Sequence, residues 1–217
     1  AQADLARRVI EELIADGTNV NVTLIFGRGQ YRESAEAYIR GLERRTAAGL
    51  DISRVASVAS VFVSRLDTLA DPLLKQLGLA DLQGKLALAN AKLTYADFKE
   101  IFAGPRWERL TAQGARVQRP LWASTGTKNS AYPDTLYVDE LVGPHTVNTI
   151  PPATLEAVLD HGRTEPTVEL GVSEASEAFA RARAAGADLD AWTEQLLQEG
   201  VASFIASYDA LIAGIAA

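Results

Sequence analysis

Four strand-like segments alternate with helical segments along this chain, and this alternation limits the possible folds more than any other feature. The expected strands, rich in valine and other apolar residues, cover 19–26, 54–63, 116–123 and 145–150. Apolar residues at helical spacing lie between them. Alternating βα units predict a parallel sheet with right-handed crossovers. Four strands cannot close an eight-stranded barrel. The pattern therefore predicts either a small open α/β sheet or the second half of a barrel.

The helical segments follow the same order. They are expected at the N-terminus up to Asp16, at 31–48, 67–78, 81–103, from Pro105, at 134–141, from Pro151 to Asp160, and from Ser173 onward as separate helices around Phe179, Trp192 and Phe204.

The charge and residue inventory excludes several classes of protein. The 217 residues include 21 basic and 28 acidic ones, a net charge of −7 that argues against a nucleic-acid or anionic-membrane partner. Because cysteine is absent, the chain has no thiolate nucleophile or disulfide, and two distant histidines, His145 and His161, make a metal site a poor expectation. The longest apolar runs are too short to cross a bilayer, and the N-terminus lacks the apolar region of a signal peptide. We therefore expect a cytoplasmic location. Since no methionine occurs anywhere, we also expect that residue 1 is not a natural translation start.

Polar side chains in the first strand are the first candidates for a site. In barrels the active site lies at the carboxyl ends of the strands and in the loops that follow them. Asn21 and Thr23 alternate with Asn19 onto one face of a mostly apolar strand, where three polar groups are costly without partners. They either satisfy neighbouring polar groups inside a barrel or contact a ligand.

The end of the second strand brings Ser60, Phe62 and Arg65 together. A guanidinium group fits the oxygens of a phosphate, so Arg65 is a candidate anion clamp. The alternative is a salt bridge from Arg65 to Asp67 or another acid.

A loop rich in hydroxyl groups follows the third strand at 124–130 and carries Lys128. Such a loop can surround a phosphate with N–H groups, hydroxyls and the lysine, or it is a solvated turn. The other lysines, at positions 75, 85, 92 and 99, fall on expected helices and are interpreted as solvated. No lysine lies within an expected strand.

Five ordered motifs resemble the transaldolase family, in particular its longer bacterial members. They are NVNVTLIF at 19–26, VASVASVFVSRLDT at 55–68, RPLWASTGTKN at 119–129, DTLYVDELVGP at 134–144 and VNTIPPATLEAVLDHG at 147–162. The resemblance implies a (β/α)8 TIM barrel of the class I aldolase type, of which this chain supplies about strands five to eight plus the C-terminal helices. Residues 1–217 would then be the C-terminal part of a single barrel domain.

The resemblance also implies an activity. Transaldolases of the pentose phosphate pathway transfer a dihydroxyacetone unit between sugar phosphates through a lysine Schiff base, without a metal or cofactor. The implied substrates are fructose 6-phosphate, sedoheptulose 7-phosphate, erythrose 4-phosphate and glyceraldehyde 3-phosphate. The Schiff-base lysine is expected upstream of residue 1. The alternative is a non-catalytic half-barrel that binds sugar phosphate or pairs with a partner chain, as a homodimer or with a missing N-terminal half.

The family pattern assigns roles to seven residues. Asn21 and Thr23 match positions that bind the dihydroxyacetone moiety and hold the catalytic water. The substrate-binding positions are Ser60 at the substrate hydroxyls, Phe62 as the family aromatic, Arg65 and Ser124 at the phosphate, and Lys128 where the enteric branch has a phosphate-binding arginine.

Overall fold

The four predicted strands form one parallel sheet. The computed structural model describes residues 2–216. Its strands are β1 (Val20–Ile25), β2 (Ser57–Phe62), β3 (Arg119–Ala123) and β4 (Val147–Asn148), in the order β1-β2-β3-β4. All three neighbouring pairs are parallel, so the predicted parallel α/β topology is confirmed. The fourth strand is shorter than the predicted 145–150, because only Val147 and Asn148 pair with β3.

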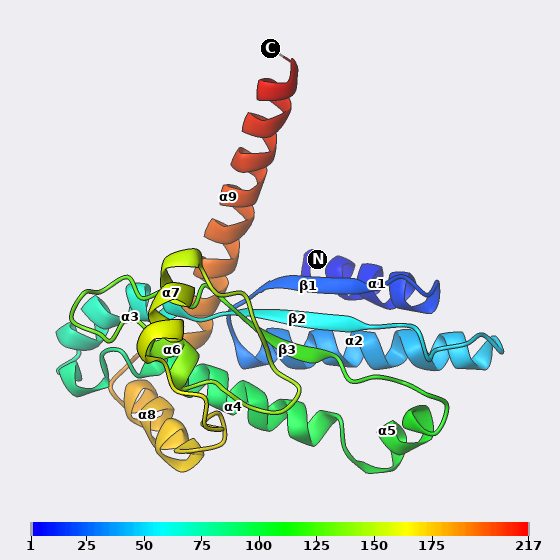
Figure 1. Cartoon of the computed structure of the whole chain (residues 1–217), viewed down its shortest axis with the longest axis horizontal. Helices are drawn as coiled ribbons and strands as arrows, with labels where there is room; N and C mark the ends of the chain where they lie inside the picture. The colour runs from blue at the N-terminus through cyan, green and yellow to red at the C-terminus, as the bar shows by residue number, and fades with distance from the viewer. Residues whose placement is uncertain (1, 217) are drawn as a thin grey trace.

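Helices connect and follow these strands in the predicted order (Figure 1). They are α1 (Gln2–Ala15), α2 (Arg28–Ala47), α3 (Ser64–Gln76), α4 (Leu86–Ile101), α5 (Gly104–Thr111), α6 (Leu136–Asp139), α7 (Pro152–His161), α8 (Val172–Ala184) and α9 (Leu189–Ala216), with a 3-10 turn at Ala80–Leu82.

Two helix predictions are wrong. The segment predicted as one helix over 81–103 becomes a 3-10 turn followed by α4, because Gly84 adopts a left-handed conformation with φ of 70° between them. The helices expected separately around Trp192 and Phe204 are one continuous helix, α9.

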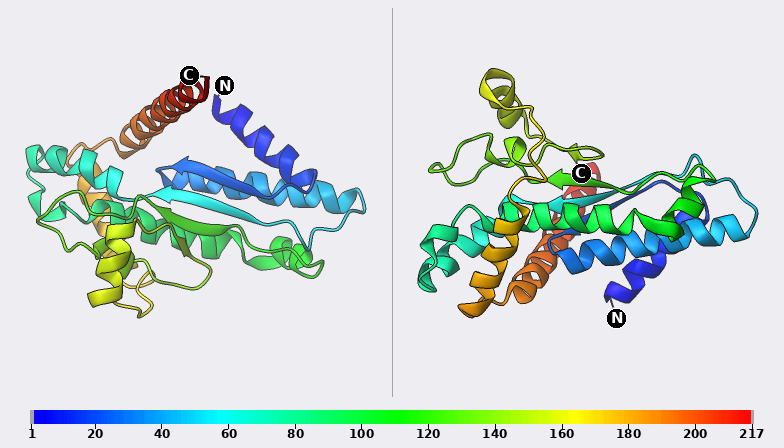
Figure 2. Two further views of the ribbon diagram at one scale, coloured as in Figure 1. Left: turned by 45° about the horizontal axis from the view of Figure 1, so that its top comes forward. Right: turned by 90° about the horizontal axis from the view of Figure 1, so that it is seen from below.

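One face of the sheet is covered by helices, and the opposite face is exposed along β1. Helices α2 and α4 lie on one side of the strands (Figure 2). Val20 and Val22 pack into this core, whereas Asn21 and Thr23, which alternate with them, are exposed. Trp122 is buried below β3, where its Nε1 donates a hydrogen bond of 3.0 Å to the carbonyl of Leu141. The exposed face is therefore the one that carries the polar residues of β1.

A bulge ends the regular part of β1. Leu24 has a φ of 59°, and the pairing with β2 shifts register between Val22 and Ile25. Leu24 is buried, and a Cβ at Gly200 would lie 2.9 Å from its Cδ2. Glycine at position 200 therefore allows α9 to cross closely over the carboxyl end of β1.

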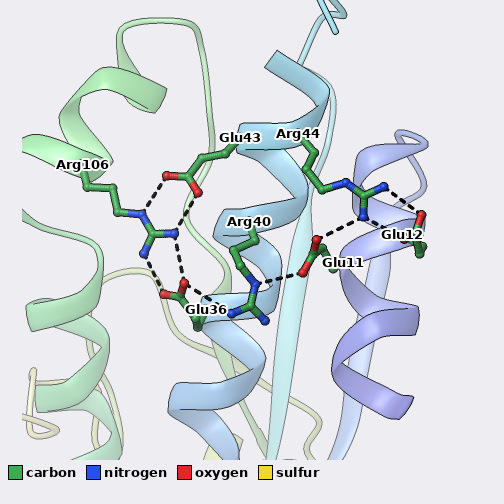
Figure 3. A network of polar contacts seen from close by, with 7 residues as sticks. All are labelled: Glu11, Glu12, Glu36, Arg40, Glu43, Arg44 and Arg106. Carbon is green, nitrogen blue, oxygen red and sulfur yellow. Dashed lines mark hydrogen bonds and ion pairs between the residues drawn. The ribbon is translucent and has the colours of Figure 1, made fainter. Parts of the chain in front are cut away.

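An ion-pair network joins α1, α2 and α5 on the covered side (Figure 3). Arg106 of α5 contacts Glu43 at 2.7 Å and Glu36 at 2.8 Å, both on α2. Two further ion pairs join α2 to α1: Arg40 contacts Glu11 at 2.9 Å, and Arg44 contacts Glu12 at 2.8 Å. The hydrogen bonds from Arg106 are the largest cause of a lowered pKa at Glu43. Since the side chains are half-exposed, the network orients the helices more than it stabilises them.

The C-terminal half of α9 projects from the body of the molecule (Figure 1). Its exposed apolar side chains recur every three or four residues: Val201, Phe204, Ile205, Tyr208, Leu211, Ile212 and Ile215. Helix α1 exposes a shorter row, Leu5, Val9 and Leu13. Exposed apolar rows of this length are typical of surfaces that pack against another polypeptide. Among residues 2–216, no helix combines the length and apolarity that a membrane span requires.

We therefore expect the chain to self-associate in a concentration-dependent way, because α9 exposes an apolar face and no strand within residues 2–216 pairs with the outer edge of β1. Sedimentation velocity should show weight-average masses above the 23.2 kDa of one chain. Substituting Phe204, Ile205 and Ile212 with serine should shift the distribution toward the monomer. The matched control substitutes Ala202, Ala206 and Ala213 of the same helix with serine and should leave it unchanged. A monomer with well-protected amides at all concentrations would contradict this expectation.

Candidate functional site

The site forms where β2 and β3 end. Pairing continues past both strands, with Val63 N donating to the Ala123 carbonyl at 2.9 Å and Ser64 N to the Ser124 carbonyl at 3.0 Å. The hydroxyls of Ser64 and Ser124 also lie 3.0 Å apart. Ser124 has a left-handed φ of 56°. That conformation is uncommon for residues other than glycine, and such strain clusters at functional sites. The two loops are therefore held against each other at the carboxyl edge of the sheet.

Arg65 lies next to this junction, in the first turn of α3. Its Cζ is 5.1 Å from the centre of the Phe62 ring, a cation–π contact that orients the guanidinium group. Within residues 2–216, no carboxylate lies within 4.0 Å of Arg65, so the alternative of a salt bridge to Asp67 is wrong. Asp67 turns into the protein instead, where it is only 2% exposed. A half-buried arginine without a carboxylate partner, directly after the residue that joins the two strand ends, is a suitable site for an anion.

Asn21 and Ser60 meet on the face of the sheet that is exposed along β1, where Asn21 is exposed and Ser60 is buried. The Ser60 hydroxyl donates a 2.7 Å hydrogen bond to Oδ1 of Asn21. Asn21 thus satisfies a neighbouring polar group, which is one of the two roles predicted for the polar residues of this strand. Thr23, two residues further along the same face, is exposed, and its hydroxyl bonds to no other side chain or backbone group in the described part of the chain. It is therefore free to bind water.

The loop after β3 is more ordered than a solvated turn. Thr125 is fully buried, and its hydroxyl donates to Oδ1 of Asn148 at 2.8 Å. Thr127 donates to two backbone carbonyls at the end of the same loop. Lys128 is exposed and lies on the wall of a cavity of about 220 Å³ that is also lined by Asp67 and Asp71 but not by Arg65. Lys128 thus lies over the next turn of α3 rather than against Arg65.

The sequence does not predict the two buried acids of α3. Asp67 and Asp71 share one face of the helix with the buried Ala70 and Leu74, and both acids are buried. Burial raises the pKa of Asp67 to about 7; hydrogen bonds from the Ala87 N–H and the Tyr137 hydroxyl act in the opposite direction, and the nearby Asp71 raises it further. The signal that could have found them is their position: two carboxylates four residues apart on the apolar face of a helix.

The remaining titratable residues take structural positions. The prediction of a solvated Lys92 is wrong, because the structure shows it buried and paired with Glu140 at 2.9 Å. His145 is exposed just before β4. His161 contacts Asp134 at 2.9 Å and Asp160 at 3.0 Å, and the contact with Asp134 is the largest cause of its raised pKa. No group of three or more His, Asp or Glu side chains within residues 2–216 is placed to hold a metal ion.

The fold and the site together define a class of protein: a parallel βα chain with its polar and cationic residues at the carboxyl edge of the sheet. The family described as Transaldolase/Fructose-6-phosphate aldolase matches residues 6–215. The chain belongs to this family.

Several curated proteins are similar to it. Transaldolase 1 of Streptomyces avermitilis is 49% identical over 211 residues, which cover 95% of this chain and 56% of that protein. Transaldolase 1 of Streptomyces coelicolor is 49% identical over 210 residues, covering 95% and 55%, and transaldolase of Mycolicibacterium smegmatis is 49% identical over 207 residues, covering 94% and 56%. The chain therefore spans a little over half the length of the curated relatives it matches.

Proposed function

We propose that this protein acts as a transaldolase of the pentose phosphate pathway in the cytoplasm. In this proposal residues 1–217 supply strands five to eight and the C-terminal helices of a (β/α)8 barrel. The observation that carries the proposal is Arg65, which has no carboxylate partner within residues 2–216 and directly follows the Ser64–Ser124 contact in the chain, in a protein that is 49% identical to transaldolases. A cation and hydroxyl groups at the carboxyl end of parallel strands suit the phosphate of a sugar phosphate.

Each residue of the site then has a role in the transfer of a dihydroxyacetone unit. Arg65 and Ser124 hold the substrate phosphate, with Lys128 as a more distant positive charge. Ser60 and Phe62 contact the sugar on the open face of the sheet. Asn21 binds the dihydroxyacetone moiety, and Thr23 holds the water through which a carboxylate moves the proton. No cofactor is needed, because the iminium formed with a lysine accepts the electron pair released when the carbon–carbon bond breaks.

The nucleophilic lysine is proposed to lie outside this chain. All five of its lysines lie off the strands: four are at 75, 85, 92 and 99, and the fifth is Lys128 in the loop after β3. None of them points from the open face of a strand, where the substrate carbonyl would lie. The same observation supports a second candidate, a non-catalytic chain that binds sugar phosphate and pairs with a partner.

Borohydride trapping tests whether the nucleophilic lysine lies outside this chain, as both candidates require. Incubated alone with fructose 6-phosphate and borohydride, the chain should gain no reduced dihydroxyacetone adduct, because it offers no lysine beside the bound sugar. An adduct on any of its five lysines, located by peptide mass spectrometry, would contradict the upstream lysine.

Complementation then tests the function itself. The partner fragment contains the residues of Streptomyces coelicolor transaldolase 1 that lie outside the matched region. Adding it should yield both an adduct on the fragment and transfer from fructose 6-phosphate to erythrose 4-phosphate. The matched control is the same mixture with Arg65→Ala in this chain, which should bind fructose 6-phosphate more weakly. If the mixed chains associate and bind fructose 6-phosphate but give neither an adduct nor transfer, the non-catalytic candidate is correct.

A further inference from the structure

The loop after β3 is fastened to α3 by two tyrosine–aspartate hydrogen bonds. The hydroxyl of Tyr132, in this loop, donates to Oδ2 of Asp71 at 2.6 Å. The hydroxyl of Tyr137, in α6 at the end of the loop, donates to Oδ2 of Asp67 at 2.8 Å. Because the two acids are one helical turn apart, the bonds run side by side. These pairs are separated by 61 and 70 positions in sequence.

The second oxygen of each carboxylate holds another segment. Oδ1 of Asp67 accepts from the Ala87 N–H at 2.8 Å, and Oδ1 of Asp71 accepts from the Gly84 N–H at 2.9 Å. The Tyr132 ring lies against Gly84, where an added Cβ would come within 2.8 Å of the ring. Asp71 therefore bridges the loop after β3 and the turn before α4, and Asp67 bridges α6 and the first turn of α4. The loop cannot slide along α3 without breaking these bonds.

Burying two carboxylates in this way costs folding free energy, so stability alone does not explain the arrangement. Two buried carboxylates one turn apart repel each other, and both lose hydration. Apolar side chains of similar volume would fill the same space without that cost. What hydrogen bonds provide in exchange is a fixed position of one segment relative to another.

The segments held in this way carry the two halves of the anion site. Helix α3 begins at Ser64 and bears Arg65 in its first turn. The loop begins at Ser124, whose hydroxyl is 3.0 Å from that of Ser64. The two bonds to Asp67 and Asp71 lie further along the same helix and near the far end of the same loop. The Ser64–Ser124 contact and the tyrosine bonds thus fix the loop against α3 at both ends.

We propose that Tyr132 and Tyr137 are positioning residues for phosphate. Through Asp71 and Asp67 they hold the loop after β3 against α3, so that Ser124 and Arg65 can contact the same phosphate. This inference rests on the proposed phosphate role of Arg65. It adds a specificity element that touches no substrate. Tyr132 is the better test of it, because this side chain is half-buried, whereas Tyr137 is 2% exposed and lies in the core.

The experiment titrates the chain with inorganic phosphate and follows the backbone amide signals of Arg65 and Ser124. Tyr132→Phe removes one hydroxyl and keeps the ring, so it should raise the phosphate dissociation constant about 3- to 10-fold, the value of one hydrogen bond. The matched control is Tyr38→Phe. The Tyr38 hydroxyl donates at 2.7 Å to the Arg116 carbonyl, so it fastens the opposite end of the β3 segment, away from the anion site. Urea unfolding of both variants measures their loss of stability.

Three comparisons decide the outcome. Weaker phosphate binding in Tyr132→Phe but not in Tyr38→Phe supports the inference, as does a double variant with Asp71→Asn that binds no more weakly than either single variant. Unchanged binding in Tyr132→Phe, or equal weakening in both tyrosine variants, overturns it. Arg65→Ala tests the anion site separately from the positioning role of the tyrosines. If that variant binds phosphate like the unmodified chain, the proposed anion site is wrong. If only Arg65→Ala weakens binding, the site stands and the positioning role fails.

Discussion

Replacing Arg65 with alanine is expected to raise the dissociation constant for fructose 6-phosphate about 10- to 150-fold. A bidentate, charge-assisted contact between a guanidinium group and a phosphate contributes roughly 1.5–3 kcal/mol, which corresponds to that range. Arg65 has no carboxylate within 4.0 Å in the described part of the chain. Its charge is therefore available to a ligand, and its removal leaves no buried acid unpaired. The measurement is a calorimetric or NMR titration of the chain with the sugar phosphate.

Unphosphorylated fructose is the control ligand for this prediction. The Arg65 variant should lose little affinity for fructose. The difference in affinity between fructose 6-phosphate and fructose should therefore become smaller. Arg65→Lys should behave more like alanine than like arginine, because an ammonium group cannot make the forked contact. In the complemented enzyme the same comparison applies to kcat/KM for the two substrates. Equal losses on fructose and fructose 6-phosphate would mean that Arg65 supports the structure, through its contact with Phe62, and does not bind phosphate.

Replacing Asp67 with asparagine is expected to stabilise the protein at pH 8 and to have little effect near pH 4. Burial raises the folded-state pKa of Asp67 from an ordinary 3.8 to about 7. A carboxyl group whose pKa is raised by folding stabilises the fold fully below its unfolded pKa, and this contribution is lost as the pH rises through the folded pKa. The window is therefore pH 4 to 7. About three pKa units at roughly 1.4 kcal/mol each set an upper limit near 4 kcal/mol.

Asparagine can keep both partners of Asp67. Its Oδ1 can accept from the Ala87 N–H, and its Nδ2 can donate to the Tyr137 oxygen, so the geometry of the bridge is retained while the charge is removed. Urea unfolding at pH 5 and pH 8 measures the difference. Asp209→Asn, on the exposed surface of α9, is the matched control and should change stability equally at both values. A variant of Asp67 that is destabilised to the same extent at pH 5 and pH 8 would show that folding does not raise the pKa of this carboxyl group.

The open face of the sheet links the structure to the proposed reaction. Asn21 and Thr23 lie in the middle of β1 and are nevertheless exposed, because no segment within residues 2–216 covers them. In a closed barrel these side chains would face the interior, at the level where substrate is bound. In the proposed barrel, these two polar residues would therefore face the bound substrate.

The sequence alone was sufficient for the order of the elements and the parallel pairing of the strands. Both follow from local patterns, because hydrophobic periodicity distinguishes helix from strand and the alternation of the two leaves one handedness of crossover. It also placed Arg65 and Ser124 at neighbouring strand ends, since the carboxyl ends of parallel strands meet at one edge. The resemblance to transaldolases rested on motifs at these same positions, and the family membership is confirmed.

Only the tertiary structure decided which way individual side chains turn. Asp67 faces Tyr137 rather than Arg65, although Arg65 is two residues away and Tyr137 is 70. Lys92 is buried because Glu140, 48 positions further along, approaches it. The bulge at Leu24 likewise accompanies the passage of Gly200 in α9. In each case the deciding partner is distant in sequence. Local propensity carries no information about such contacts, and the free energy that settles the orientation arises only when the chain packs.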